Sequence, residues 1–524
     1  MLRSKLRLVL SAALLTGPLT AATCEGLSAL KPAGTTITAA TSVAAGAFTP
    51  PAGLQLGQAG VDYKKLPAFC RVQGVLQPSA DSHIEFEIWL PASGWNGKYE
   101  GLGNGGFAGS IDFGGMGDAV SNGYVASASD TGHKGSAIDG RWAVGHPEKI
   151  TDFGYRAVHE TAEKAKVVIK AFYEKRPRYS YFSSCSNGGR EALMEAQRFP
   201  LDYDGILAGA PANYWTRLLS SAMADALMLS DPAAYIPAAK LPAIQAATLA
   251  ACDAQDGVQD GIIGEPSRCK FDPAQLLCNS GESDSCLTAP QVAALQKLYT
   301  AKQGFPGHLP GGETGGNGWG DWITGAAPGR SLMFAFGTGF FGNFVYDNAA
   351  WDFHTFQPDK GTQVADDKFV RTLNATDPDL SRFRDRKGKL IIYHGWSDAA
   401  ISALNSIDYF KSVQQKMGNP QTAQFVRLYL APGMAHCGGG PGPDSFGQGS
   451  VAPADPQHSI SKSLETWVEQ GTAPHALIAT KYKAGNAASG VARTRPLCPY
   501  PQVAQYRGSG STDDAANFAC AEPK

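Results

Sequence analysis

The segment YSYFSSCSNGGREALMEAQRF, residues 179–199, is the clearest local indication of the fold class. Its first seven residues are rich in β-formers, a glycine pair follows, and Ala192, Ala196 and Phe199 then recur at helical spacing. A strand that turns tightly into a helix is the setting of a nucleophile elbow, in which a strained turn lifts a serine above a parallel sheet. Glycine-rich turns with a serine also occur for purely structural reasons. The segment therefore predicts an α/β fold and makes Ser186 a candidate nucleophile.

Strand-like and helix-like segments alternate from about residue 83, which predicts a mostly parallel sheet flanked by helices. The alternation stops between residues 214 and 384, where cysteines, glycines and aromatic residues are frequent, and then resumes. We therefore expect a catalytic domain of residues 23–213 and 385–524 with a large lid domain, residues 214–384, inserted into it. A separate tandem domain is the alternative. The strand-like segments are IEFEIWLP, YVASASD, YFSSC, GILAGAP, KLIIYHG and FVRLYLAPG.

Two strand-like segments end in residues that could complete a catalytic triad. Asp398 follows KLIIYHGWS and His436 follows VRLYLAPGMA. A serine hydroxyl needs a base in order to attack, and a carboxylate must orient that base. Each residue alone could be a helix cap or a loop histidine, but the chain order Ser, Asp, His is that of α/β-hydrolases. We predict an α/β-hydrolase core with Ser186, Asp398 and His436 as the triad, and the backbone amide of Asn187 as one oxyanion donor.

The ten cysteines are an even number, which favours disulfides in an exported chain. Cys185 directly precedes Ser186 and Cys437 directly follows His436, so a disulfide between them would fix the separation of nucleophile and base. The competing interpretation makes Cys185 a thiolate nucleophile, which fits an oxidising compartment poorly. Proximity along the chain favours the pairs Cys252 with Cys269, Cys278 with Cys286, and Cys498 with Cys520.

The N-terminus has the pattern of a secretory signal peptide. Basic residues precede an apolar run that ends near Leu19, and small residues follow at 21 and 22. Gly17 and Pro18 interrupt the run, which is too short to span a membrane. We expect cleavage after residues 1–22 and a secreted or periplasmic protein that is not membrane-bound. The 45 Lys and Arg against 47 Asp and Glu, with no basic run beyond the N-terminus, argue against a nucleic-acid partner.

The segment CDAQDGVQDGIIGEPSRC within the predicted lid carries Asp253, Asp256 and Asp260 close together, separated by glycines. Hard cations such as Ca²⁺ bind several oxygens, which carboxylates and backbone carbonyls supply. The spacing is not that of an EF-hand. A structural calcium site is one interpretation of the segment, and an acidic, solvated turn is the other.

Four segments resemble the tannase and feruloyl esterase family, which also contains mono-hydroxyethyl terephthalate hydrolases. They are CSNGGREALMEAQRFPLDYDGILAGAPA, IIYHGWSDAAIS, PGMAHCGGGPGPDSF and RTRPLCPYPQVAQYRGSGS. The resemblance implies an α/β-hydrolase with a lid, the same triad, and a disulfide between Cys185 and Cys437. It also implies the three local pairs and a fifth, Cys24 with Cys70. Family members often have an acidic residue where this chain has Asn187.

The resemblance also supplies residues that spacing alone does not. The glycine-rich stretch WNGKYEGLGNGGFAG is similar to the family's oxyanion loop and places the second amide at Gly106. The family's lid calcium site matches the three aspartates together with the carbonyls of Val258 and Ile262. We accordingly expect a structural Ca²⁺ and no organic cofactor.

These observations together predict a serine esterase that acts on a small aromatic ester through an acyl-enzyme. Terephthalate-ester hydrolases of the family use a lid arginine to hold the free carboxylate, whereas the corresponding stretch here, SLMFAFGTGFFGNF, is apolar and Arg330 only lies near it. We therefore favour hydroxycinnamoyl (feruloyl-type) esters, with gallate esters (a tannase) and terephthalate monoesters as alternatives. A catalytically silent, Ca²⁺-dependent secreted binding protein is the hypothesis of a different class.

Overall fold

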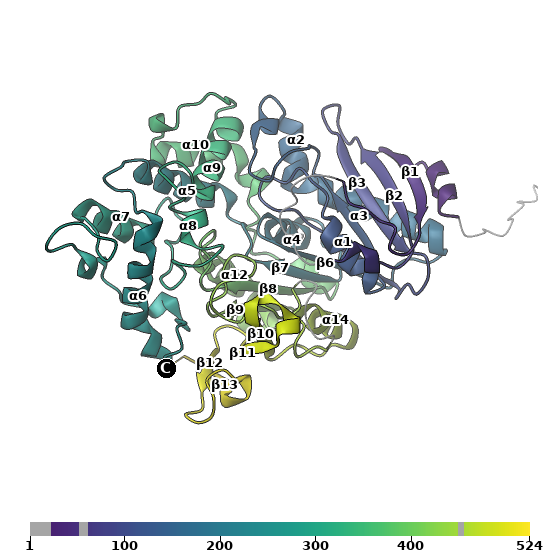
Figure 1. The fold of residues 1–524 in the computed structure, drawn as a ribbon. Coiled ribbons are helices and arrows are strands. Elements are labelled where there is room, and N and C mark those ends of the chain that lie inside the picture. Colours follow the sequence, from purple (N-terminus) through teal and green to yellow (C-terminus); the bar gives the residue numbers. More distant parts are fainter. Residues whose placement is uncertain (1–22, 52–60, 449–454, 524) are drawn as a thin grey trace, which may run out of the picture.

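A nine-stranded sheet forms the centre of the molecule in the computed structural model, which describes residues 23–51, 61–448 and 455–523 (Figure 1). The strand order is β1-β2-β3-β5-β4-β6-β7-β8-β9. The first three pairings are antiparallel and the remaining five are parallel. The predicted α/β fold with a mostly parallel sheet is therefore confirmed. The strands are β1 (Thr35–Val43), β2 (Phe69–Leu76), β3 (Ile84–Pro91), β4 (Lys98–Leu102), β5 (Val125–Ser129), β6 (Tyr179–Cys185), β7 (Gly205–Gly209), β8 (Lys389–Gly395) and β9 (Val426–Ala431).

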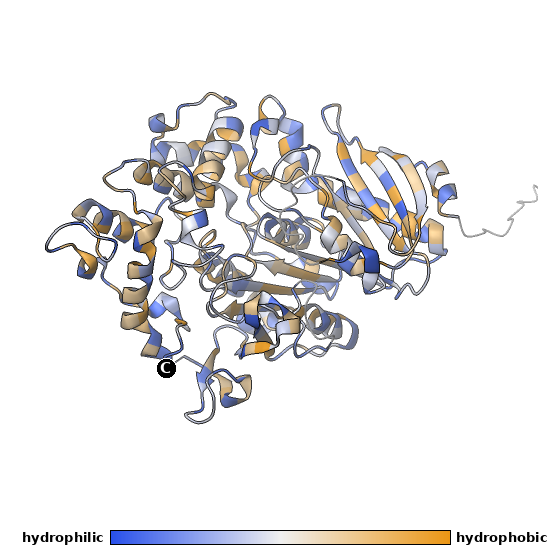
Figure 2. Ribbon diagram, viewed as in Figure 1, coloured by the Kyte–Doolittle hydropathy of each residue, from blue (hydrophilic) through white to orange (hydrophobic). Residues whose placement is uncertain are grey.

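Helices cover both faces of this sheet and bury a separate core on each. Successive side chains of a strand point to opposite faces, so Phe182 of β6 packs with one set of helices and its neighbour Tyr181 with the other. The first set is α3 (Ala157–Tyr173), α4 (Asn187–Arg198) and α12 (Ala403–Met417), and the second is α1 (Phe113–Ser121) and α14 (Ile460–Gln470). The hydropathy colouring shows the result: the central strands are mostly apolar, whereas β1 to β3 alternate (Figure 2).

The chain between β7 and β8 is helical and lies beyond one end of the sheet (Figure 1). Its core is aromatic, and it includes Phe107 from the loop after β4, whose ring centroid lies 5.3 Å from those of Phe336 and Phe344. This segment therefore packs directly on the loop that was expected to supply an oxyanion donor. Its helices are α5 (Trp215–Leu229), α6 (Leu241–Cys252), α7 (Ala289–Tyr299), α8 (Trp319–Trp322), α9 (Leu332–Gly339), α10 (Pro358–Leu373) and α11 (Ser381–Asp385).

All six strand-like segments form strands, but the sequence did not predict β1, β2 or β4. β4 lies in the middle of the sheet although its sequence, KYEGL, contains a lysine, a glutamate and a glycine. Two C-terminal hairpins were also unexpected. They are β10 (Leu477–Tyr482) with β11 (Val491–Leu497), and β12 (Val503–Tyr506) with β13 (Phe518–Ala521).

Five disulfides join all ten cysteines, in the pairs that the resemblance implies. Such a set indicates an oxidising compartment. Across residues 23–51, 61–448 and 455–523, no helix is long and apolar enough to cross a membrane. The predicted signal peptide, residues 1–22, lies outside the described residues.

Candidate active site

Ser186 lies at the turn between β6 and α4 with backbone angles φ 66° and ψ −124°. A non-glycine residue at positive φ is strained, and it persists only where its surroundings fix it. Here the Ser186 amide donates to the Gly209 carbonyl (3.0 Å), and the Ser186 carbonyl accepts from the amides of Arg190 (3.1 Å) and Ala212 (3.1 Å). The end of β7 and the first turn of α4 therefore hold the serine in this strained conformation.

The glycine pair after Ser186 is required by close packing. A Cβ atom on Gly188 would lie 1.9 Å from the Ser184 Oγ, and one on Gly189 would lie 2.2 Å from the Gly209 carbonyl oxygen. The first turn of α4 thus packs so closely against β6 and β7 that a side chain at 188 or 189 would not fit. Ser184, which stands where nucleophile elbows usually have a glycine, fits because Gly188 leaves room for its hydroxyl.

The structure brings the three predicted triad residues together. His436 Nε2 lies 2.9 Å from Ser186 Oγ, and His436 Nδ1 lies 2.8 Å from Asp398 Oδ2. Burial alone would raise the pKa of Asp398, but the adjacent His436 and a hydrogen bond from His394 hold it below its usual range. An ionised carboxylate accepts only. His436 therefore carries its hydrogen on Nδ1 and presents the Nε2 lone pair to the serine hydroxyl.

His394 is a neighbour of the triad that sequence reasoning missed. It is fully buried, and its Nε2 lies 3.1 Å from Asp398 Oδ2 and 2.9 Å from the Ile401 carbonyl oxygen. Because both of these atoms are acceptors, Nε2 carries the hydrogen, and Nδ1 accepts from the Ser406 hydroxyl (2.7 Å). His394 therefore donates to the same carboxylate oxygen as His436 does.

The two predicted oxyanion donors, Gly106 and Asn187, line the same cavity as Ser186. Within the described residues, neither backbone amide has a hydrogen-bond acceptor. Gly106 has φ 57°, and a Cβ there would lie 2.2 Å from the Ala137 carbonyl oxygen, so the loop requires glycine at this position. Both amides are available to a ligand.

The disulfide between Cys185 and Cys437 joins the end of β6, next to Ser186, to the loop that carries His436, with a Cα–Cα distance of 6.0 Å. Cys437 also has a positive φ of 61°. Since no thiol is left at Cys185, the thiolate interpretation is wrong. The bridge joins the direct neighbours of Ser186 and His436. It therefore limits how far these two hydrogen-bonded residues can move apart.

The cavity at Ser186 has a volume of about 1010 Å³ and two chemically different ends. The end beneath the lid is apolar and is lined by Trp215, Leu218, Leu219, Trp322, Met333 and Phe336. The other end, between the sheet, α1 and α14, carries Glu100, Asp112, Asp118 and Glu465. Burial there, with Asp118 and Glu465 nearby, raises the pKa of Glu100 to about 8. Lys462 is the one Lys or Arg among the described lining residues, and it pairs with Glu465 at 2.7 Å.

Two residues of the predicted lid contact or support His436 directly. Asn317 Nδ2 donates to the His436 carbonyl oxygen (2.7 Å), and its Oδ1 accepts from Trp322 Nε1 (2.6 Å). The Trp322 ring meets the His436 ring edge-on, with centroids 5.0 Å apart. The lid therefore contributes to the placement of His436 as well as to the cavity wall.

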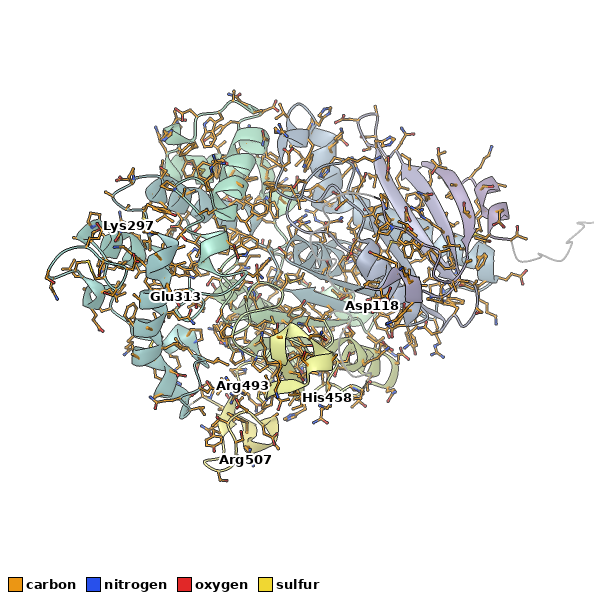
Figure 3. The ribbon with its side chains drawn as sticks, in the orientation of Figure 1. Asp118, Lys297, Glu313, His458, Arg493 and Arg507 are labelled. Carbon is orange, nitrogen blue, oxygen red and sulfur yellow. A yellow bond between two sulfur atoms is a disulfide. The ribbon has the colours of Figure 1, made fainter. Side chains whose placement is uncertain are left out.

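The acidic lid segment folds into a loop around its own aspartates. Asp253 accepts from the Gly261 amide (3.0 Å), Asp256 from the Val258 amide (3.0 Å), and Asp260 from the Ile262 amide (3.2 Å). Arg493, labelled in Figure 3, and Arg495 reach across from β11 and pair with Asp260. In the described part of the chain, Asp253 and Asp256 have no cationic partner.

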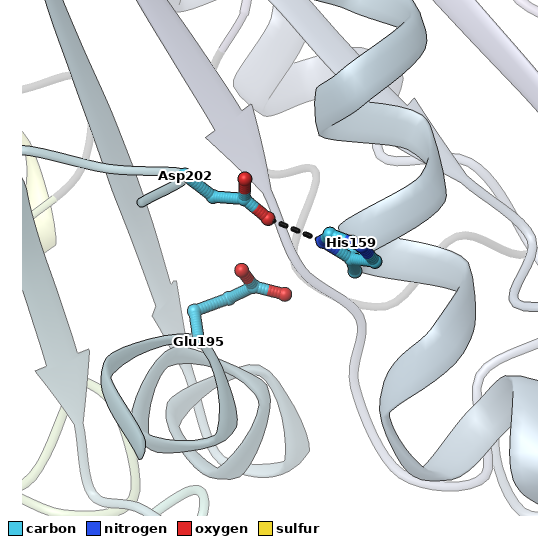
Figure 4. A group of neighbouring side chains, drawn as sticks. All are labelled: His159, Glu195 and Asp202. Carbon is cyan, nitrogen blue, oxygen red and sulfur yellow. Dashed lines mark hydrogen bonds and ion pairs between the residues drawn. The ribbon is translucent and has the colours of Figure 1, made fainter. Parts of the chain in front are cut away.

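A different group of side chains, His159, Glu195 and Asp202, has its candidate ligand atoms within 4.8 Å of one another and could hold a metal ion (Figure 4). The lid aspartates do not come this close; among residues 23–51, 61–448 and 455–523 only this group does. His159 Nδ1 lies 2.6 Å from Asp202 Oδ2, and Lys166 Nζ donates to Asp202 Oδ1 (3.1 Å). Burial, with Asp202 nearby, raises the pKa of Glu195 well above its usual range.

Comparison with known proteins agrees with this geometry. Residues 70–521 match the family model described as tannase and feruloyl esterase. The chain belongs to the tannase and feruloyl esterase family. It is accordingly a carboxylic ester hydrolase, as predicted.

Three relatives show how far the similarity extends. An uncharacterized esterase of Xanthomonas campestris is 43% identical, with 97% of this chain and 93% of that protein aligned. A mono(2-hydroxyethyl) terephthalate hydrolase of Piscinibacter sakaiensis is 33% identical, with 87% and 85% aligned. The crystal structure of feruloyl esterase B from Aspergillus oryzae superposes with a TM-score of 0.86 at 29% identity, covering 95% of this chain and 99% of that one.

Replacing both Cys185 and Cys437 by alanine is expected to lower kcat more than the loss of stability explains, because a misplacement of about 1 Å can cost roughly a hundredfold. The rate should be measured well below the melting temperature of the variant. The control is the corresponding Cys498/Cys520 double variant, which should lose stability and keep kcat. Wild-type kcat in the folded Cys185/Cys437 variant would show that the bridge contributes only stability.

The buried carboxyl of Glu191 on α4 should make stability depend on pH. Burial raises its pKa to about 7, although Arg190 and hydrogen bonds from Asn104 and Asn187 oppose the shift. Because the folded state disfavours the ionised form, wild type loses stability as pH rises from about 4.3, the unfolded value, towards 7. Glu191→Gln cannot ionise, so the melting temperature of wild type relative to this variant should fall between pH 5 and pH 8. An exposed control, Glu163→Gln, should show a constant difference.

Proposed function

We propose that the protein is an exported serine esterase that hydrolyses esters of uncharged aromatic acids, with hydroxycinnamoyl esters favoured. The observation that carries this proposal is the hydrogen-bonded chain of Ser186, His436 and Asp398 at the edge of a cavity whose lid end is apolar and aromatic. Such pockets suit an aromatic ring.

The geometry supports a two-step acyl transfer. Ser186 Oγ attacks the ester carbonyl carbon while His436 Nε2 takes the hydroxyl proton, and Asp398 stabilises the imidazolium that forms. The amides of Gly106 and Asn187 bind the oxyanion of the tetrahedral intermediate. His436 then returns the proton to the leaving alcohol, which leaves the acyl group on Ser186. A water molecule, deprotonated by the same nitrogen, releases the acid and restores the serine.

The charges around the cavity favour an uncharged acyl group. A terephthalate monoester carries a free carboxylate, which would need a cation at the far end of the acyl pocket. Arg330 is not among the described lining residues, and Lys462 lies at the opposite end, where it pairs with Glu465. Ferulate or gallate esters present hydroxyl groups instead, so a desolvated charge without a partner is avoided.

The lid, residues 214–384, is proposed to carry a structural Ca²⁺. The donor set fits a hard cation, because three carboxylates lie within one loop and, among the described residues, only Asp260 of the three forms ion pairs with the arginines of β11. Asp253, Asp256 and Asp260 would hold the ion with the carbonyls of Val258 and Ile262. A bound Ca²⁺ would neutralise the loop and would take no part in acyl transfer. Export through cleavage of residues 1–22 is part of the same proposal, supported by the five disulfides.

The decisive assay compares initial rates on methyl ferulate, methyl gallate and a terephthalate monoester for wild type and Ser186→Ala. We expect wild type to prefer methyl ferulate, to accept the gallate ester more slowly and to act least on the monoester, with Ser186→Ala at background on all three. Equal, negligible rates for both proteins on all three esters would favour a binding protein instead.

Chelation should lower the melting temperature more than it lowers kcat at moderate temperature, because an ion that binds only the folded lid stabilises the fold by mass action. Asp253→Asn should abolish the effect of the chelator, whereas Asp272→Asn, which removes an exposed lid aspartate outside the loop, should leave it intact. Identical melting curves with and without chelator, in protein shown by elemental analysis to contain calcium beforehand, would exclude the site.

A further inference from the structure

Glu191 lies beneath the nucleophile turn and is 1% exposed, yet the acyl-transfer steps do not use it. Its two carboxylate oxygens bind two different segments. Oε2 accepts from the Asn104 backbone amide (2.9 Å), and Oε1 accepts from the Asn187 side-chain amide (2.9 Å). A single buried carboxylate therefore joins the loop after β4 to the first turn of α4.

These two segments are the ones that supply the proposed oxyanion donors. Asn104 lies two residues before Gly106, and Asn187 supplies the second amide from its own backbone. The loop is also held from its other side, because Asn104 Nδ2 donates to the carbonyls of Ser110 (2.7 Å) and Ser129 (2.9 Å). A Cβ on Gly103 would lie 2.4 Å from Glu191 Oε2, so the loop backbone rests directly on this carboxylate.

Arg190 fixes the orientation of the Asn187 side-chain amide. Its guanidinium is fully buried and donates to the carbonyls of Gly154 (2.6 Å) and Phe153 (2.9 Å) and, through Nε, to Asn187 Oδ1 (2.8 Å). Because arginine only donates, the oxygen of Asn187 must face it and the NH₂ group must face Glu191. An acidic residue at 187 would instead place two carboxylates against each other.

We propose that Glu191 is the positioning residue of the oxyanion hole, and that Asn187 and Glu191 form one matched donor–acceptor pair that sets the separation of the Gly106 and Asn187 amides. This inference rests on the proposed function, since it assigns those two amides to the oxyanion. Glu191 itself touches no reacting atom. Its effect on catalysis passes through the backbone of the loop and of the turn.

The pair can be tested by exchanging the hydrogen-bond donor and acceptor between residues 187 and 191. In Glu191→Gln two NH₂ groups meet, and in Asn187→Asp two carboxylates meet, so each single variant should displace the loop. Removing or misplacing one oxyanion donor costs about 10²–10³ in rate, and partial displacement should lower kcat by about 10- to 100-fold with little change in KM. In the double variant Asn187→Asp/Glu191→Gln, the introduced glutamine donates to the introduced carboxylate and still accepts from Asn104. Only the longer bond from Asn187 Nδ2 to the Asn104 carbonyl (3.4 Å) is lost, so kcat should return to within a few-fold of wild type.

A matched control and a second readout keep this test separate from the esterase assay. Glu87→Gln changes another buried glutamate, on β3, whose side chain bonds Arg71, Gln73 and Trp89, and it should leave kcat unchanged. Hydrogen exchange of the peptide around residues 103–107 should be faster in both single variants and restored in the double variant, whether or not a substrate has been found. Inactive wild type would therefore refute the proposed esterase activity without affecting this measurement. Single variants with wild-type exchange, or a double variant no better than the singles, would overturn the positioning role.

Discussion

The positive-φ conformation of Ser186 is the constraint on which the rest of the site depends. It is maintained by hydrogen bonds from β7 and from the first turn of α4, so the strained residue is fixed by its neighbours on both sides. That arrangement requires α4 to approach the strands at backbone distance, and only glycines at 188 and 189 permit this. The orientation of the serine hydroxyl therefore depends on two other features together. These are the parallel pairing of β6 with β7 and the glycine pair that lets α4 pack against them.

Specific bonds connect three other segments to this turn or to its partner His436: the histidine loop, the glycine-rich loop and the lid. A disulfide attaches the histidine loop, a buried carboxylate attaches the glycine-rich loop, and an asparagine of the lid attaches to the histidine's carbonyl. Each of these bonds joins residues far apart in the sequence. Preorganisation of this kind lets donors and base act without rearrangement when charge develops. The segment between β7 and β8 thus contacts His436 directly, in addition to lining the cavity.

A feature of the fold or of the site could be predicted where the residues that form it make a short sequence motif. The serine turn, the triad order and the paired cysteines are short motifs, and the structure places those residues next to one another. The role of Glu191 could not be predicted, because Arg190, Glu191 and Glu195 are charged residues on a helix and helical periodicity would assign them to the solvent face. All three are buried; Arg190 and Glu191 bond to other segments, and Glu195 lies beside His159 and Asp202. β4 was missed for a related reason, since Glu100 faces a cavity that only the folded chain creates and Lys98 pairs with Glu465 and Glu469 of α14.

The C-terminal hairpin has a consequence for how the molecule is assembled. Arg493 and Arg495 of β11 pair with Asp260 in the middle of the chain, and the Arg493 guanidinium also donates to the Asp260 carbonyl. Until β11 has docked, Asp260 lacks the two guanidinium groups that pair with it. If the N-terminal part of the chain folds first, much of the sheet can form early, but Asp260 gains these partners only when the last few dozen residues have joined. The C-terminal hairpin therefore completes the ion pairs of a loop that lies more than two hundred residues earlier in the sequence.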